Sequence, residues 1–315
     1  MATQAKTLTN SSVVGEQAAQ SGPLYIVGQV VKYGLLILMT LILLGPFVLA
    51  FFGSFKTVNE VLASPPTLWP QNWQPENYSR VWNAQQASGD DFITQFFKAI
   101  GLGTSLFPRW LFNSVFLAAI HVVLQLFLCS LAAYAFARLD FKGKNLVFTL
   151  MLATLMIPGV ALLMPRYFII NQINLVNTYW AVILPSAVGA GGIFLLTQFF
   201  RSIPKDLEEA AAIDGAGLFT TYSRVILPLA RPALATLAVL EFQGSWNDFQ
   251  NPLIFLNTPD YFPLTVGLSA LKDGYTSQVN LILAASMFNT IPAILIFAFF
   301  SRYFVEGSTY AGVKG

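Results

Sequence analysis

The chain has 315 residues, of which 55% are hydrophobic and only 10% are charged. Soluble domains carry about 25% charged residues, so this chain lacks the polar surface of a water-soluble protein, and most of its outer surface must face lipid. Its net charge of +2 includes no basic block of the kind that binds nucleic acid. The single cysteine, Cys129, excludes an intrachain disulfide, and one cysteine with one histidine, His121, argues against a metal site.

Residues 1–31 are predicted to form a cytoplasmic tail that is mostly disordered. Residues 1–23 are rich in Ser, Thr, Gln and Ala and lack the apolar core of a signal peptide. A membrane helix needs about 20 mostly apolar residues, and six later segments meet that requirement. They are residues 32–52, 111–137, 146–170, 179–200, 232–256 and 281–304. The sequence therefore predicts an all-α polytopic membrane protein, with a six-helix domain over residues 32–304 and a C-terminal tail over residues 305–315.

Basic residues predict the orientation of these helices, because cytoplasmic loops carry an excess of Lys and Arg. With the N-terminus inside, the inner segments hold 11 of the 17 basic residues and the outer segments hold 6. Both termini are then cytoplasmic, as is the loop over residues 201–231. The segments over residues 53–110, rich in proline and polar residues, and over residues 257–280 become outer loops. His121 and Cys129 lie inside the second helix, where they are read as packed residues, with a proton relay as the alternative for His121.

The inner loop over residues 201–231 is a polar segment in an apolar chain. Ser202 is placed to cap a helix, and acidic residues then follow where the helix dipole favours them. Ala210, Ala211 and Ala212 favour the helix, and Gly215 and Gly217 are expected to stop it. A second short helix is expected from about Phe219 to just before Pro228. One interpretation of this helix–turn–helix is an interfacial helix that only anchors the bundle.

The residues of the loop favour a second interpretation. Glu209-Ala210-Ala211, with Gly215 six residues after the glutamate and Val225-Ile226-Leu227-Pro228 after that, resembles the EAA loop of ABC importer permeases, with Val225 in place of the usual Ile. Five other segments resemble carbohydrate-type members of this family: Ser54-Phe55-Lys56, Arg109-Trp110-Leu111-Phe112-Asn113-Ser114, Ala132-Ala133-Tyr134-Ala135-Phe136-Ala137-Arg138, Trp246-Asn247-Asp248-Phe249 and the tail Ala311-Gly312-Val313-Lys314-Gly315. From about residue 30 onward the chain is identified as a carbohydrate-type ABC importer permease, of the maltose-type subunit with a short C-terminal tail. The stretch over residues 83–106 departs from the family as an extra outer segment.

The resemblance implies a type I ABC importer permease fold in the bacterial cytoplasmic (inner) membrane. It also implies four kinds of partner: a second homologous permease, two copies of a cytoplasmic ATPase, a periplasmic or lipid-anchored solute-binding protein, and membrane lipid. The chain has no Walker A motif and no catalytic constellation, so it is expected to be a transport subunit, not an enzyme. It is expected to bind no cofactor itself, with ATP and Mg held by the ATPase subunits.

Two sets of contact residues follow from the resemblance. The expected ATPase-coupling residues are Glu208, Glu209, Ala210, Ala211, Asp214, Gly215, Ala216 and Pro228. A further expected contact is the C-terminal tail at Gly312, Val313 and Lys314, for which a frayed terminus is the alternative.

Polar residues inside a membrane span are costly and usually face a cavity or the bundle interior. The fifth helix contains six candidates for the substrate path: Glu241, Gln243, Trp246, Asn247, Asp248 and Asn251. Helix–helix contact between the two permeases is the alternative, and Asp248 is also placed to cap a broken helix. The solute stays open among oligosaccharides, disaccharides, polyols, glycosylated osmolytes and glycerol phosphates. An ABC permease for a non-sugar solute and a stand-alone secondary transporter are the other interpretations.

Overall fold

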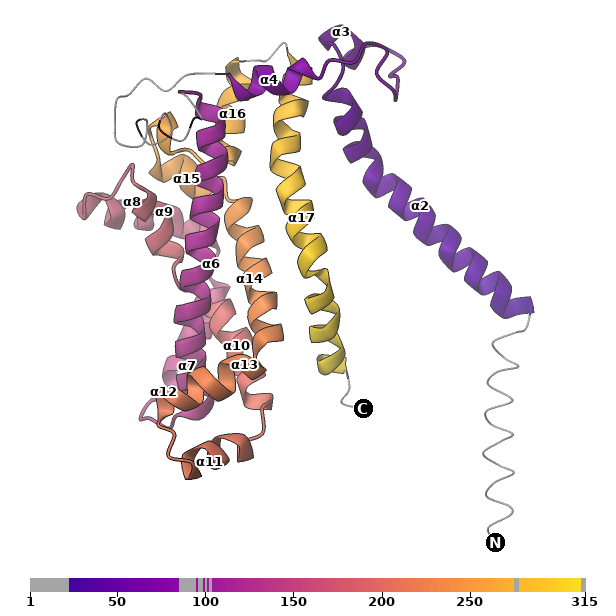
Figure 1. The fold of residues 1–315 in the computed structure, drawn as a ribbon. Helices are drawn as coiled ribbons and strands as arrows, with labels where there is room; N and C mark the ends of the chain where they lie inside the picture. The colour runs from indigo at the N-terminus through magenta and orange to yellow at the C-terminus, as the bar shows by residue number, and fades with distance from the viewer. Residues whose placement is uncertain are drawn as a thin grey trace.

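The computed structural model describes residues 23–84, 95, 99, 101, 104–274 and 278–312, which form an elongated bundle of helices (Figure 1). Three of the helices in these ranges contain a straight segment long and apolar enough to cross a membrane: α2 (Pro23–Gly53), α6 (Leu106–Arg138) and α17 (Val279–Gly312). Three more candidate spans are pairs of helices joined at a bend. Counting each bent pair as one span gives six among the described residues, which is the number that the sequence predicts. The third pair, however, begins at Leu218, inside the predicted inner loop, and ends at Trp246, with a bend of 77°.

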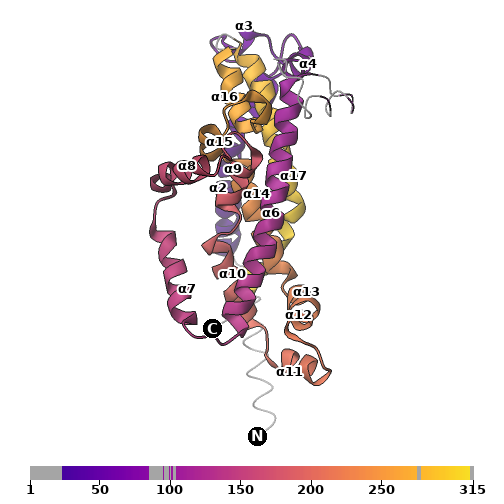
Figure 2. The same cartoon turned by 90° about the vertical axis from the view of Figure 1, so that its left-hand side faces the viewer.

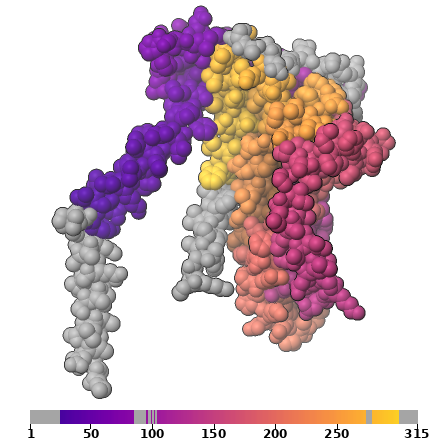
Figure 3. Space-filling model, turned by 180° about the vertical axis from the view of Figure 1, so that it is seen from behind, coloured from indigo at the N-terminus to yellow at the C-terminus, as the bar shows by residue number. Residues whose placement is uncertain are grey.

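Both ends of the predicted six-helix domain lie elsewhere than expected. The first helix begins at Pro23 instead of residue 32, and the last continues to Gly312 instead of ending at residue 304. The remainder of the predicted N-terminal tail, residues 1–22, and the tail residues Val313 and Lys314 lie outside the described residues. α2 leans away from the other helices (Figures 1 and 3), and none of its most apolar window is buried. Its apolar surface is therefore left for lipid or for another protein chain.

The predicted third helix is broken, so the expectation of one continuous span over residues 146–170 is wrong. α7 (Lys144–Ala153) continues as a 3₁₀ turn (Thr154–Met156), and a second turn (Gly159–Leu162) leads into α8 (Leu163–Gln172). The two halves meet at 100°, and α8 runs across the bundle (Figure 2). The break lies at Ile157, whose ψ of 119° is extended, because the residue before a proline (here Pro158) is disfavoured in the helical region.

The predicted fourth and fifth helices are also interrupted. α9 (Tyr179–Ile183) and its 3₁₀ extension (Leu184–Ser186) meet α10 (Ala190–Ser202) at 43°, with Gly189 extended at the join. α14 (Arg231–Trp246) ends one turn before α15 (Gln250–Phe255). Asp248 Oδ1 accepts a hydrogen bond from the Asn251 backbone N–H at 3.2 Å, so it caps the broken helix as the alternative interpretation predicts.

α6 is the central helix of the bundle, and α10 and α14 pack along it. Two apolar clusters hold the three helices together. The inner cluster includes Ala133, Phe200, Ile226 and Leu237. The outer cluster includes Phe107, Trp110, Trp246 and Leu264. Because the bulky members of both clusters are almost fully buried, the core extends over most of the length of α6.

The first outer loop packs over the bundle and is held there by a cluster of buried hydrogen bonds. It contains α3 (Val58–Val61) and α4 (Glu76–Trp82). The side-chain amide of Asn77, in α4, donates to the backbone carbonyls of Ser54 and Lys56, both at 2.9 Å. Burial raises the pKa of Tyr78, so its phenol keeps its proton and bonds to Ser54 Oγ at 2.8 Å. Residues 53–84 of the predicted outer loop thus cover one end of the bundle, and residues 106–110 of that range belong to α6.

The second outer loop is held by the start of α6. This loop contains a 3₁₀ turn (Pro259–Tyr261) and α16 (Leu264–Gly274). Asn113 Nδ2 donates to the carbonyls of Asp260 and Phe262, both at 2.9 Å, and Trp110 Nε1 donates to the Pro259 carbonyl at 2.8 Å. Arg109, which is 1% exposed, forms an ion pair with Asp260. The Arg109–Ser114 segment that resembles the family therefore has a structural role at the outer face.

Substituting Gly267 with alanine is expected to destabilise the outer half of the bundle. A Cβ at this position would lie 2.2 Å from the ring of Trp110, which is fully buried. Overpacking of this kind costs about 1–3 kcal/mol, so the melting temperature of the purified Gly267→Ala protein should fall. Gly191→Ala in α10 is the control, because its new Cβ meets nothing within 4 Å. Equal melting temperatures for the two variants would contradict this packing.

Candidate functional site

The inner end of the structure presents α11 (Asp206–Ile213), a short helix with no buried residue that lies below the bundle (Figures 1 and 2). Its N-cap is Lys205, which makes no capping side-chain bond. The prediction that Ser202 caps this helix is wrong, because Ser202 is still the last residue of α10 and donates to the Phe199 carbonyl at 2.7 Å. The start of α11 relies instead on the acidic residues of its first turn, which the helix dipole favours.

The end of α11 is a Schellman motif, the hydrogen-bonded helix stop that a left-handed residue allows. Gly215 has φ +81°. The Gly215 N–H bonds to the Ala212 carbonyl at 3.0 Å, and the Ala216 N–H bonds to the Ala211 carbonyl at 2.9 Å. The prediction that Gly215 stops the helix is confirmed. Gly217, by contrast, has φ −77° and begins the next helix as its N-cap.

The second helix of the loop runs past the predicted stop at Pro228. It consists of α12 (Leu218–Thr221), a π-helical turn (Tyr222–Ile226) and α13 (Leu227–Leu229). In a regular α-helix a proline ring clashes with the carbonyl four residues earlier. The residue four before Pro228 lies in the π-helical turn, which is wider than an α-helical turn. Tyr222 and Ile226 are buried, and the Tyr222 hydroxyl bonds to Ser130 Oγ of α6 at 2.8 Å. This helix therefore fixes the loop to α6.

A buried cation joins α11 to the inner end of α6. Arg138 Nε lies 2.5 Å from Glu208 Oε1, and Arg138 Nη2 donates to the Ile203 carbonyl at 2.7 Å. The contact between Arg138 Nε and Glu208 Oε1 does not have the geometry of a hydrogen bond, so it is an ion pair. Among the predicted coupling residues, three are partly buried: Glu208, Ala211 and Ala216. The exposed ones are Glu209, Ala210, Asp214, Gly215 and Pro228.

A second candidate site is a cavity of about 290 Å³ in the outer half of the bundle. It is enclosed by α6, by the 3₁₀ turn that follows α9, and by α14 and α15. Its polar lining residues are Ser114, His121, Ser186, Ser245, Asp248 and Asn251. The cavity thus opens beside the two helix breaks that interrupt the fourth and fifth spans.

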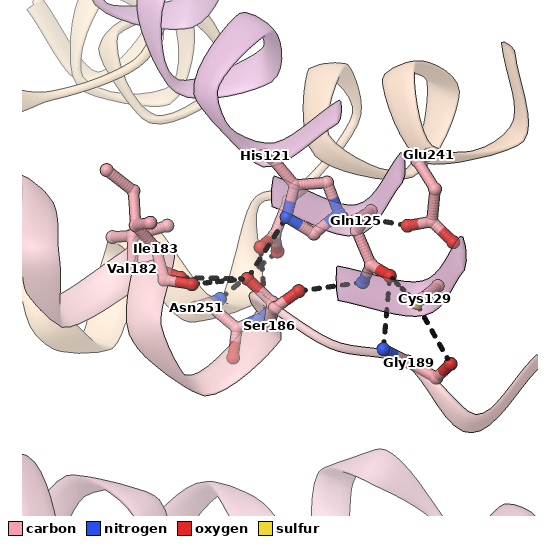
Figure 4. Close-up of polar contacts among 10 residues, drawn as sticks. His121, Gln125, Cys129, Val182, Ile183, Ser186, Gly189, Glu241 and Asn251 are labelled. Atoms are coloured by element: carbon pink, nitrogen blue, oxygen red, sulfur yellow. Dashed lines mark hydrogen bonds and ion pairs between the residues drawn. The ribbon is translucent and has the colours of Figure 1, made fainter. Parts of the chain in front are cut away.

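A hydrogen-bonded network lies beside the cavity, where α6 contacts α14 and the break between α9 and α10 (Figure 4). His121 Nε2 lies 2.9 Å from Glu241 Oε2, and His121 Nδ1 lies 3.3 Å from Ser186 Oγ. Gln125 donates to the Ser186 carbonyl at 2.8 Å and accepts from the Gly189 N–H at 3.1 Å. This single amide thereby satisfies two backbone groups that the helix break leaves open.

The six residues predicted for the substrate path do not share one surface. Asp248 and Asn251 line the cavity, and Glu241 adjoins it through His121. Gln243 and Asn247 line a different hollow of about 370 Å³ between α2, α14 and α17. Trp246 is 2% exposed and donates to the Asn289 carbonyl at 3.0 Å, so it holds α14 on α17.

Several residues of these sites have no place in the sequence prediction. Ser186 gave no signal, because a lone serine in an apolar run is unremarkable, and Ser114 entered only as the last residue of the Arg109–Ser114 segment that resembles the family. Gln125 and Arg138 did carry one, since an amide or a cation within a membrane helix needs a partner. The direction of each of these side chains depends on tertiary packing.

Residues 125–307 match the family model described as binding-protein-dependent transport system inner membrane component. The chain is 37% identical to the arabinooligosaccharides transport system permease protein AraQ of Halalkalibacterium halodurans, over 89% of this chain and 98% of that protein. It is 32% identical to the diacetylchitobiose uptake system permease protein NgcG of Streptomyces coelicolor, over 90% and 87% of the two chains. The fold is similar to a chain of a bacterial ABC transporter involved in the import of the acidic polysaccharide alginate, with a TM-score of 0.73, 22% identity, and 90% and 98% coverage.

Removing the Gln125 side chain is expected to expose Cys129. The thiol is buried and lies one helical turn from Gln125, with Sγ 2.9 Å from Gln125 Oε1. Gln125→Ala should therefore raise the rate at which N-ethylmaleimide labels Cys129 by about tenfold, measured by mass spectrometry of this chain. The control is Thr236→Ala, whose lost hydroxyl donates to the Pro232 carbonyl within α14. Equal labelling rates in the two variants would show that Gln125 does not shield the thiol.

Proposed function

This chain belongs to the family of binding-protein-dependent transport system inner membrane components, and we propose that it is the permease subunit of an ATP-driven importer whose solute is a sugar. Family membership makes it a multi-pass protein of the bacterial inner membrane and a transport subunit without catalysis of its own. The sugar class is supported by the relatives named for arabinooligosaccharides and diacetylchitobiose. The polar cavity between α6, α14 and α15 is compatible with a hydroxylated solute.

Within this proposal the chain forms half of a translocation path and needs a second, homologous permease. Two observations support this. The cavity is bounded by helical segments on one side of the bundle, and α2 carries a long apolar surface that is not buried by the part of the chain that the structure describes. The complex also contains a solute-binding protein outside the membrane and two copies of an ATPase inside, which hold ATP and Mg. With α11 inside, both termini of the chain are cytoplasmic.

The observation that carries the proposal is the construction of α11. The helix has no buried residue, ends in a Schellman motif, and is joined to α6 by the Arg138–Glu208 ion pair. A rigid-body switch needs a stiff connection. We assign the exposed Glu209, Ala210, Asp214, Gly215 and Pro228 to the ATPase contact. Glu208, Ala211 and Ala216 hold the helix in place, and the tail at Gly312, Val313 and Lys314 adds a second contact.

Co-purification tests this assignment. Tagged chain, co-expressed with the permease and ATPase genes of its own transport system, should purify as a complex with two ATPase copies. In proteoliposomes, ATP hydrolysis should rise when the binding protein and its sugar are added. Uptake that depends on an ion gradient and not on ATP would instead indicate a secondary transporter.

Two substitutions in α11 are expected to abolish the stimulated hydrolysis while the chain remains inserted in the membrane. Glu209→Lys reverses an exposed charge in the proposed contact. Gly215→Asp places a side chain at φ +81°, where a residue with a Cβ is disfavoured by about 1–2 kcal/mol. The measurement is ATP hydrolysis with and without the binding protein.

Matched controls exist for both substitutions. Asp140→Lys makes the same kind of charge reversal on the neighbouring inner loop, where Asp140 is exposed. Gly217→Asp adds the same side chain at φ −77°, at an N-cap position that favours aspartate. Both should retain stimulated hydrolysis. Normal stimulation in Glu209→Lys and Gly215→Asp would contradict the role of α11.

A further inference from the structure

We propose that the cavity of this subunit binds one uncharged sugar residue of the solute in transit and discriminates against acidic sugars. This inference rests on the proposed function, because it names the chemical class that the importer accepts. It depends on three properties of the cavity: its size, the hydroxyl and amide side chains in its wall, and the sign of the charges around it.

The size limits what the cavity holds. Its volume of about 290 Å³ lies at the lower end of the range for small-molecule sites, roughly 300–1,000 Å³. A space of that size accommodates a single sugar ring. A longer oligosaccharide would therefore have to pass with one residue at a time in this cavity.

The wall of the cavity carries polar side chains that can bond to sugar hydroxyls. Asn251 lines the cavity, and its Nδ2 donates to Asp248 Oδ2 at 2.9 Å. A serine hydroxyl both donates and accepts, so it can pair with a sugar hydroxyl in either sense. The hydroxyls of Ser114, Ser186 and Ser245 lie around the same space.

The charges around the cavity disfavour an anion. Asp248 is among the lining residues, and Glu241 contacts His121 at the edge. None of the residues that line the cavity is a lysine or an arginine. The carboxylate of a uronic acid would thus enter a site that contains an aspartate and lacks a fixed cation, and repulsion between like charges is strong where water is scarce. Discrimination against a wrong ligand often rests on such an unfavourable contact.

The test uses the whole complex, with its binding protein, in proteoliposomes. Uptake of radiolabelled arabinotriose, maltotriose and diacetylchitobiose, which are uncharged, is compared with uptake of an alginate trisaccharide. Each is expressed per ATP hydrolysed. The wild-type complex should transport at least one uncharged probe and should not transport the alginate trisaccharide.

Two variants test the cavity itself. Asn251→Ala removes an amide from the cavity wall together with its contact to Asp248, and Ser245→Ala removes one hydroxyl from the cavity wall without touching the Asp248–Asn251 contact. Loss of one hydrogen bond should lower the uptake of the transported probe per ATP by about fivefold, with stimulated ATP hydrolysis retained. The control is Thr290→Ala, which lies in the other hollow, between α2, α14 and α17, and should keep the wild-type ratio.

The outcomes separate the two proposals. Uptake of the alginate trisaccharide by the wild type, or an unchanged ratio in both cavity variants, overturns the binding site and leaves the importer function standing. Absence of binding-protein-stimulated ATP hydrolysis in the wild type overturns the importer function, and the cavity proposal with it. A lowered ratio in Ser245→Ala supports the site even if Asn251→Ala fails to fold.

Discussion

The arrangement of the bundle depends on one requirement. The polar side chains along α6 need hydrogen-bond or ion-pair partners at membrane depth. A polar group without a partner is expensive in a low-dielectric interior, and α6 carries such groups from end to end. Arg109 and Asn113 share one side of the helix, as do His121 and Gln125, because each pair is four residues apart. Their partners come from the second outer loop, from α14 and from the break between α9 and α10. The positions of these elements are therefore set by what α6 must bind.

The broken helices follow from the same constraint. Irregular backbone is tolerated at membrane depth only where protein or a water-filled cavity satisfies it. Gln125 meets this requirement at Gly189, and Asp248 does so at the start of α15. Each interruption also leaves room beside it, and the cavity lies between these two breaks. A chain of six continuous helices would pack α14 and α10 against α6 without leaving that space.

The sequence predicts what depends on local rules and misses what depends on contacts. Six spans follow from apolar length, and the stop at Gly215 follows from the left-handed conformation that glycine accepts. The third span was expected to be continuous, but the residue before Pro158 is extended, and α8 finds contacts across the bundle after a 100° bend. Ser202 has the right chemistry for a cap, yet α10 continues through it. The candidate substrate residues were predicted to share one helix, but they are divided between α14, α15 and the break between them, and only packing decides that Asp248 and Asn247 face different hollows.

The loop over residues 201–231 and the cavity are joined by one rigid element, the helix α6. Arg138 and Ser130 fix the loop to α6, and His121 at the cavity lies 17 residues before Arg138 (138 − 121), which is about 25 Å along a helix. α6 is regular over this whole length, so it has no hinge at which a displacement of α11 is absorbed. Under the proposed function, movement of the ATPases therefore reaches the cavity as a shift of α6 as a whole. The polar side chains of α6 bond to neighbouring elements, and these contacts must then move with α6 or break. The main ones are His121 with Glu241 and Gln125 with Gly189. Two discrete arrangements of those contacts would be sufficient to open and close the cavity towards the inside.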